Sequence, residues 1–159
     1  MNRLSDTSRQ RLFIYALMAF SLVLSGQAAA SSWSTEATLI SQTAVAETGD
    51  GTARLLVDFA QGNQCEPEII LMIQGSPQTS GKKVGLGVDK RGQYESDIQT
   101  ITGEQYAVSF TKKANDLVSD LRKGYRASVS IPGENAIRFS LSGSSSAISF
   151  AQKRCKALQ

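Results

Sequence analysis

Two segments in the last quarter of the chain alternate strictly between apolar and polar side chains, which is the period of a β-strand with one buried face. The apolar positions are odd-numbered in residues 125–131 and also in residues 137–141. If both sets face one core, directly opposed residues must both be odd-numbered, as in a Val129–Ile137 pair. The sequence therefore predicts an antiparallel hairpin whose loop holds three or five residues.

Shorter runs of strand composition, separated by turn residues, fill most of the chain after Trp33. Residues 69–73 are consecutive large apolar residues, a pattern typical of a strand that is covered on both faces. Residues 82–89 and 93–101 indicate a hairpin around residues 90–92. Other predicted strands span residues 37–45, 52–60 and 104–112.

Two segments have the periodicity of amphipathic helices. In residues 115–123 we expect Asn115 as the N-cap and Gly124 as the glycine that follows the last turn. Residues 145–158 form the second helix, in which Cys155 falls on the apolar stripe. That stripe consists of Ile148, Ala151, Cys155 and Leu158.

These elements together predict a mainly β fold. With about seven strands, we expect an antiparallel β-sandwich or a half-open barrel. Two short α-helices accompany the strands, and the second helix lies at the C-terminus and packs on the sheet. No internal repeat is evident, so one domain accounts for the strand-forming part of the chain.

Residues 1–30 have the three parts of a cleavable secretory signal peptide. Three arginines precede an apolar run over residues 12–24, and residues 28–30 are alanines that suit cleavage. The apolar run is shorter than the roughly 20 residues of a membrane-spanning helix. We therefore expect a single exported domain over residues 31–159, periplasmic or secreted, with no permanent membrane anchor after cleavage.

The charge balance of the mature domain is close to neutral. The whole chain has 17 basic and 14 acidic residues, and the predicted leader removes three arginines and one aspartate, which leaves a net charge of +1. A near-neutral domain offers no general electrostatic attraction for nucleic acid. Nucleic acid is therefore not an expected partner.

The chain has only two cysteines, Cys65 and Cys155, in a protein expected to enter an oxidising compartment. A single internal pairing is available, so we predict a Cys65–Cys155 disulfide. Two free thiols and an intermolecular bridge are the alternatives.

The absence of histidine excludes Ser-His-Asp and Cys-His catalysis and removes the commonest transition-metal ligand. Residues 75–83 superficially resemble a phosphate-binding loop, but the glycine spacing and Lys83 do not fit that motif. Ser80 and Lys83 have the spacing of a serine–lysine nucleophile, yet a glycine-centred loop would not aim them at each other. We expect no catalytic residues, cofactor or metal.

Three sets of residues remain as candidate sites. Glu95 and Asp97 lie two apart on a predicted strand and share a face, as paired carboxylates of a small hydrolase would, although such a pair on one solvated strand is usually ordinary surface. Trp33, the single tryptophan, either packs the first strand on the core or stacks on a ligand. A possible binding face for a carboxylate or a sugar combines arginine with serine hydroxyls on the final hairpin: Arg126, Ser128, Arg138 and Ser140.

The closing region resembles the invasion-associated locus B family of small periplasmic proteins. The similar residues are Leu121 to Gly124, the strand residues 129–131, the run Phe139 to Ser144, Ala147-Ile148 and Cys155. The N-terminal half departs from the family, because only Cys65 is available for its early cysteine pattern. The resemblance implies a non-catalytic envelope protein linked to host contact or envelope integrity.

The expected function is therefore a non-enzymatic binding or accessory protein of the bacterial envelope, with an envelope or secreted protein as its partner. It could be a soluble component of an envelope or secretion assembly. The alternatives are an inhibitor of a secreted or host enzyme, which would use a protruding loop over residues 74–83, and a small carboxylate-dependent hydrolase.

Overall fold

The computed structural model describes residues 33–75, 83–102 and 105–159, and residues 31–159 form one compact unit. The predicted leader, residues 1–30, lies outside the described residues. The elements are, in chain order, β1 Trp33–Ala37, β2 Ser41–Glu47, β3 Ala53–Ala60, the 3-10 turn η1 Gln61–Asn63, β4 Pro67–Gln74, β5 Lys83–Val88, β6 Gly92–Asp97, β7 Gln99–Thr102, β8 Gln105–Ser109, α2 Ala114–Lys123, β9 Arg126–Ser130, β10 Ile137–Ser140 and α3 Ser144–Ala157.

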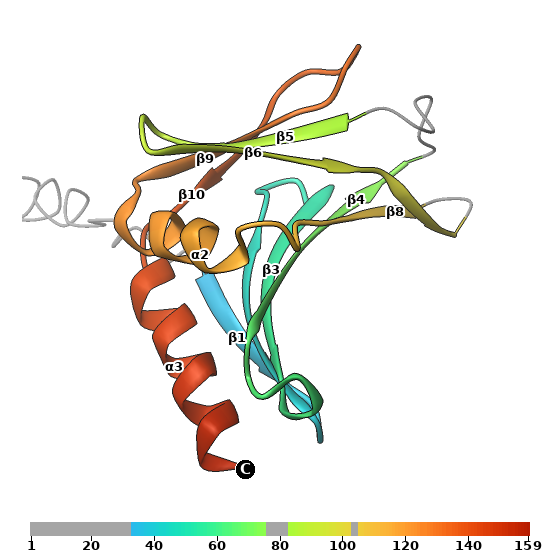
Figure 1. Ribbon diagram of the computed structural model, residues 1–159. Helices are drawn as coiled ribbons and strands as arrows, with labels where there is room; N and C mark the ends of the chain where they lie inside the picture. Colours follow the sequence, from blue (N-terminus) through green and yellow to red (C-terminus); the bar gives the residue numbers. More distant parts are fainter. Residues whose placement is uncertain (1–32, 76–82, 103–104) are drawn as a thin grey trace, which may run out of the picture. The chain divides into compact units, whose positions relative to one another are not determined.

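The strands form two antiparallel sheets, which confirms the predicted fold class. Sheet A has the order β1-β2-β3-β4-β8-β7 and sheet B the order β10-β9-β5-β6. Sheet B lies across the upper end of sheet A, and α3 runs down the side of the molecule (Figure 1). Helix α3 packs against β1, β2, β3 and α2. Both sheets keep edge strands, so the fold is an open sandwich and not a closed barrel.

The core lies between the sheets and the helices, and the two-residue period of the strands builds it. Residues such as Leu55, Ile69 and Val129 are fully buried, while their neighbours in sequence point outward. Each fully buried aliphatic or aromatic side chain contributes about 1.5–3 kcal/mol to stability. Helices α2 and α3 add Leu121 and Ile148 to the same core.

The predicted register of the final hairpin is confirmed, because Ile137 pairs with Val129. The loop is longer than the three or five residues expected. Pairing ends at Val129–Ile137, so residues 130–136 lie beyond the last pair. The alternation fixes the parity of the pairing, but it does not fix where the pairing ends.

Ten strands are present among the described residues, more than the seven or so expected. Strand β1 precedes most of the strand predicted over residues 37–45, and the strand predicted over residues 93–101 is divided. Residues 37–45 contain a turn between β1 and β2, closed by a hydrogen bond from the Thr38 amide to the Ser41 carbonyl of 2.9 Å. Residues 93–101 contain the boundary between β6 in sheet B and β7 in sheet A. Only Ile98 separates these two strands, so the chain crosses between the sheets almost without interruption.

Strand β4 was expected to be covered on both faces, and this is wrong. Ile69, Leu71 and Ile73 are buried, whereas Ile70 and Met72 on the outer face are only half-buried. The five-residue apolar run therefore belongs to a strand with one core face and one partly covered outer face.

Both helices lie within a residue of their predicted bounds, but their ends differ in detail. The N-cap of α2 is Lys113 in a left-handed conformation, whereas Asn115 lies inside the first turn and donates to Glu66. Gly124 is the C-cap in an extended conformation and does not adopt the left-handed form. In α3, Cys155 is fully buried as predicted, but Leu158 is half exposed.

A disulfide joins Cys65, just before β4, to Cys155 in the last turn of α3, with their Cα atoms 5.9 Å apart. This is the predicted pairing. It fixes the end of α3 against the segment that connects β3 to β4.

Candidate functional site

A polar recess occupies the outer face of sheet B. Antiparallel pairing places Ser128 of β9 beside Gly87 of β5, and Gly87 opposite Gln93 of β6. The recess has a volume of about 420 Å³. It is lined by Gly87, Asp89, Gln93, Arg126, Ser128 and Ser130.

Strand β5 carries glycine at alternate positions on this face of sheet B, at Gly85 and Gly87. A Cβ atom on Gly87 would lie 2.6 Å from Nε2 of Gln93, and one on Gly85 would lie 2.6 Å from Oγ of Ser130. Real Cβ atoms do not approach so closely, so the neighbouring side chains occupy the space that these glycines leave. The Gln93 side chain therefore lies over Gly87 and forms the floor of the recess there.

Asp89 holds the end of the recess next to Arg126. Its carboxylate accepts the backbone N–H of Tyr125 at 2.5 Å and, more weakly, that of Arg126 at 3.4 Å. Asp89 also has a positive φ of 44° in the β5–β6 turn. These contacts fix the start of β9, from which the exposed Arg126 side chain projects.

The chemistry of the recess is that of a polar binding surface. A guanidinium, a carboxamide and two hydroxyls present several hydrogen-bond donors around a shallow floor. Guanidinium groups bind carboxylates with paired, charge-assisted hydrogen bonds. The arrangement therefore suits a ligand that carries a carboxylate or hydroxyl groups.

The structure divides the predicted arginine and serine face. Arg126 and Ser128 line the recess, whereas Arg138 lines a separate hollow that also contains Asp50. Hydrogen bonding by Thr48 and Thr52 lowers the pKa of Asp50 to about 2. Arg138 therefore shares its hollow with a carboxylate of the protein itself.

Ser140 and Trp33 contact each other instead of joining the recess. Nε1 of Trp33 donates to the backbone carbonyl of Ser140 at 3.0 Å, and Trp33 is 5% exposed. Trp33 also lines a hollow with residues of α3, among them Phe150. The contact packs β1 onto the molecule.

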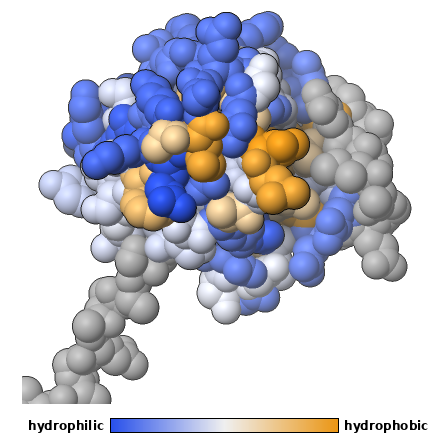
Figure 2. All heavy atoms as spheres, turned by 90° about the horizontal axis from the view of Figure 1, so that it is seen from below, coloured by the Kyte–Doolittle hydropathy of each residue, from blue (hydrophilic) through white to orange (hydrophobic). Residues whose placement is uncertain are grey.

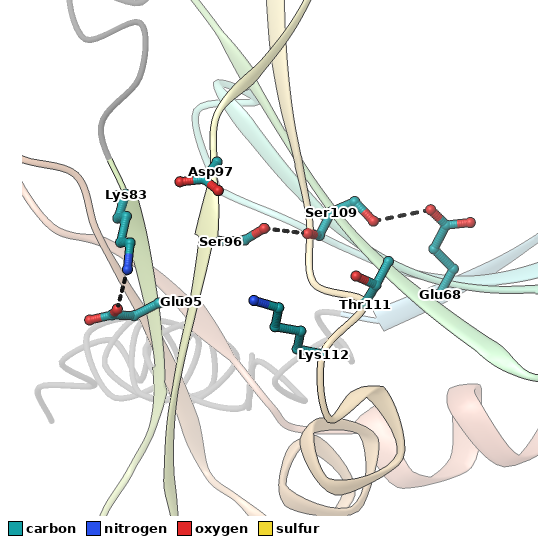
Figure 3. Close-up of a pocket in the computed structure, with 8 residues that line it drawn as sticks. All are labelled: Glu68, Lys83, Glu95, Ser96, Asp97, Ser109, Thr111 and Lys112. Atoms are coloured by element: carbon teal, nitrogen blue, oxygen red, sulfur yellow. Dashed lines mark hydrogen bonds and ion pairs between the residues drawn. The ribbon is translucent and has the colours of Figure 1, made fainter.

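Glu95 and Asp97 line a second pocket of about 450 Å³, where edge strand β6 of sheet B meets β8 of sheet A. The side-chain hydroxyl of Ser96 donates to the Ser109 carbonyl at 2.5 Å and ties the two sheets together there. Figure 3 shows Lys112 extending into the middle of this sheet-junction pocket.

The carboxylates of the sheet-junction pocket are turned to different neighbours. Glu95 pairs with Lys83 at 3.7 Å, and Glu68 accepts from the Ser109 hydroxyl at 3.1 Å. Glu95 and Asp97 project from the same strand, away from Glu68 (Figure 3). The pocket therefore has the predicted pair on the wall formed by β6 and Glu68 on the wall formed by sheet A.

Several lining residues were not assigned to a site from the sequence: Asp89, Gln93 and Ser130 of the recess and Glu68 and Lys112 of the sheet-junction pocket. The glycines of β5 were a usable signal, because alternate glycines in a strand indicate close packing on one face. Of the loop proposed for an inhibitor, residues 76–82 lie outside the described residues, as does Ser80.

Among the residues that the structure describes, no group of three acidic, histidine or cysteine side chains could hold a metal ion. None of the described helices has the length and apolar character to cross a membrane.

Comparison with known proteins supports the fold. A crystal structure titled invasion associated protein B, from Bartonella henselae, matches 81% of this chain and 94% of that chain, with a TM-score of 0.52 and 20% sequence identity. The match confirms the resemblance predicted from the closing region and extends it to most of the described domain. No protein-family model matches the chain, and no curated protein sequence matches it either.

Proposed function

We propose that this chain is a non-enzymatic binding protein of the bacterial envelope, periplasmic or secreted, which engages a carboxylate-bearing partner protein in the recess on sheet B. The observation that carries the proposal is the juxtaposition of Arg126, Ser128 and Gln93 in one recess, where the Gln93 side chain lies over Gly87. Rigid β-strands position all four residues, which is the arrangement that preorganised binding sites use.

Two observations support the envelope part of the proposal. The Cys65–Cys155 disulfide is typical of proteins that work in an oxidising compartment. The fold is that of a protein described as invasion associated, which favours a role in contact with a host or in maintaining the envelope.

The contacts of the acidic side chains in the sheet-junction pocket support the proposal that the protein is not an enzyme. Glu95 faces Lys83, and Glu68 faces Ser109, so each has a partner within the protein. A carboxylate-dependent hydrolase needs two carboxyl groups on opposite sides of a cleft. Glu95 and Asp97 lie on one wall instead.

Site-specific photocrosslinking in the producing bacterium tests the proposal. A photoreactive amino acid replaces Ser128 in the recess or, as the control, the exposed Ser149 on α3. We expect one abundant crosslinked envelope or secreted protein from position 128 and none of that mass from position 149. Equal products from both positions would contradict binding at the recess.

Arg138 supplies a matched control, because it lies on the neighbouring strand and is paired beside Ser128 but lines another hollow. We expect Arg126→Ala to reduce the crosslink at least tenfold and Arg138→Ala to leave it unchanged. Glu95→Gln with Asp97→Asn should also leave it unchanged. If the Glu95→Gln and Asp97→Asn double variant behaves in the bacterium like a deletion of the protein while the crosslink persists, the sheet-junction pocket has the functional role.

A further inference from the structure

Two large aliphatic side chains are exposed side by side at the turn between β1 and β2. Leu39 is 95% exposed and Ile40 is 69% exposed. Tips of β-turns usually carry polar residues, glycine or proline. Single apolar residues scattered over a surface are common, whereas contiguous exposed apolar patches mark interaction sites.

Hydrogen bonds within the turn hold these side chains outward. The Thr38 hydroxyl accepts the backbone N–H of Ser41 at 3.0 Å and that of Ile40 at 3.3 Å. The Thr38 amide donates to the Ser41 carbonyl at 2.9 Å. The exposed pair therefore sits on a turn whose backbone groups are satisfied from within.

The end of α3 lies at the same end of the molecule as this turn. The Ile40 carbonyl accepts the Gln61 amide at 2.9 Å, and the chain continues through η1 to Cys65. The disulfide from Cys65 then fixes Cys155 in the last turn of α3. Figure 2 looks at the molecule from this side and shows hydrophobic clusters close together on a mainly hydrophilic surface.

The charge of this end is positive where α3 contributes to it. Helix α3 contains no acidic residue, and its last turns carry the exposed side chains of Lys153, Arg154 and Lys156. Four acidic residues belong to the neighbouring segments. Glu36 pairs with Arg54, and Glu66 accepts from Asn115 at 3.4 Å. Asp58 accepts from the Thr43 hydroxyl, and Glu68 accepts from the Ser109 hydroxyl. Leu158, which follows α3, is half exposed and adds to the apolar surface.

We propose that this end of the domain docks on an anionic lipid surface. We call it the lipid-facing end: Leu39, Ile40, Lys153, Arg154, Lys156 and Leu158. The two aliphatic side chains of the turn enter the boundary between head groups and acyl chains, and the basic side chains contact the anionic head groups.

The shape and charge favour a lipid surface over a protein partner. A projecting pair of aliphatic side chains requires no matching pocket in a fluid bilayer, whereas a protein would have to supply one. The basic residues on the adjacent helix complement anionic lipids, and their long side chains can reach head groups while the apolar turn inserts. This site is separate from the recess on sheet B, so the two proposals can fail independently.

Cosedimentation with vesicles tests the proposal, using the exported protein purified from the periplasm, with its N-terminus read by mass spectrometry. We expect binding to vesicles of phosphatidylethanolamine and phosphatidylglycerol, weak binding to phosphatidylcholine, and loss of binding as salt rises. Absence of binding to the anionic vesicles at low salt would overturn the proposal. All variants must have the same N-terminus, so that any residual leader affects them equally.

Variants at the tip identify the contacting residues. Leu39→Ser with Ile40→Ser should weaken binding by roughly tenfold or more, since each buried aliphatic side chain contributes that much to transfer from water. Tyr125→Ser is the matched control, because Tyr125 is 85% exposed but lies beside Asp89 in the β5–β6 turn. Equal binding by the tip variant and the wild type would overturn the proposal.

Two further measurements distinguish lipid binding from association of the protein with itself. Neutralising Lys153, Arg154 and Lys156 to glutamine should reduce affinity by roughly fivefold for each charge and flatten the salt dependence. The tryptophan of a Leu39→Trp variant should shift its fluorescence to the blue with anionic vesicles, whereas that of a Tyr125→Trp variant should not. The wild type could instead be a dimer that does not bind the vesicles, with the tip variant a monomer. In that case the tip is a protein interface and the proposal is wrong.

Discussion

The hydroxyl of Tyr94 in β6 donates to the carboxylate of Asp120 in α2, across an oxygen–oxygen distance of 2.7 Å. Tyr94 is 8% exposed, so the bond ties an edge strand of sheet B to the helix next to it. A hydrogen bond to a charged group contributes about 1.5–3 kcal/mol when both partners are shielded from water.

Tyr94→Phe should therefore lower the free energy of unfolding by about 1–2 kcal/mol, because it removes this donor and leaves the ring in place. Urea unfolding followed by circular dichroism measures the change. Tyr125→Phe, at an exposed tyrosine, is the control and should have no effect. A Tyr94→Phe variant as stable as the wild type would mean that water replaces the hydroxyl at no cost.

High pH should destabilise the protein through its buried tyrosines. Burial, helped by the nearby Glu134, raises the pKa of Tyr106 to about 12, above the ordinary 10.0. Burial also raises the pKa of Tyr94. Between pH 10 and pH 12 the folded chain keeps the Tyr106 proton that the unfolded chain has lost. The free energy of unfolding therefore falls as pH rises through this range.

Urea midpoints measured at increasing pH, together with tyrosinate absorbance, test this prediction. The stability should be constant with respect to these tyrosines below pH 10 and fall above it, by up to about 3 kcal/mol for Tyr106. Tyr106→Phe should make the decline shallower. Tyrosinate absorbance that rises fully before the fold is lost would contradict the assignment.

Gly124 should be irreplaceable although its backbone conformation is ordinary. A Cβ atom there would lie 2.6 Å from Cγ1 of Val88 and 2.8 Å from Cδ1 of Leu141, both buried. Gly124→Ala should therefore destabilise the domain by about 1–3 kcal/mol, the usual cost of overpacking. Gly49→Ala is the matched control, since nothing lies within 4 Å of its Cβ position. Thermal melts of the two variants distinguish this steric cost from a general cost of replacing glycine.

Removing the disulfide should have the largest effect. It closes a loop between residues 90 positions apart in the sequence, and the loop-entropy model assigns such a crosslink about 4–5 kcal/mol. Cys65→Ser with Cys155→Ser should lower the urea midpoint accordingly. A reducing agent should destabilise the wild type to the same level and leave the double variant unchanged. A wild type indifferent to reduction would show that the bond contributes little.

The sequence predicts those features that depend on neighbours along the chain. Strict alternation in residues 125–131 and 137–141 was enough to define the Val129–Ile137 register. The helical stripe was enough to bury Cys155 beside Cys65. Each of these patterns lies within one segment of the chain, and the apolar face of that segment packs into the core.

Features that depend on contacts between distant segments could not be predicted in this way. The turn at Leu39 and Ile40 was missed because its apolar residues continue the strand pattern. The crossing between the sheets at Ile98 was missed because β6 and β7 both have the composition of a strand, and composition does not show which sheet a strand joins. The recess needs residues from three strands, and only Arg126, Ser128 and the glycines of β5 had a sequence signal. Gly124 looked like a helix-ending glycine, whereas Val88 and Leu141 are the reason that it is needed.

The bond between Cys65 and Cys155 turns most of the chain into a covalent ring, which contains all of sheet B, α2 and most of α3 and leaves β1, β2 and β3 outside. A single protease cut anywhere between the two cysteines opens the ring into one branched molecule and releases no fragment. The protein can therefore lose a peptide bond in any connection within the ring and still keep all of its parts together. In an environment rich in proteases, damage of that kind would change its mobility on a reducing gel while leaving its mass almost unchanged.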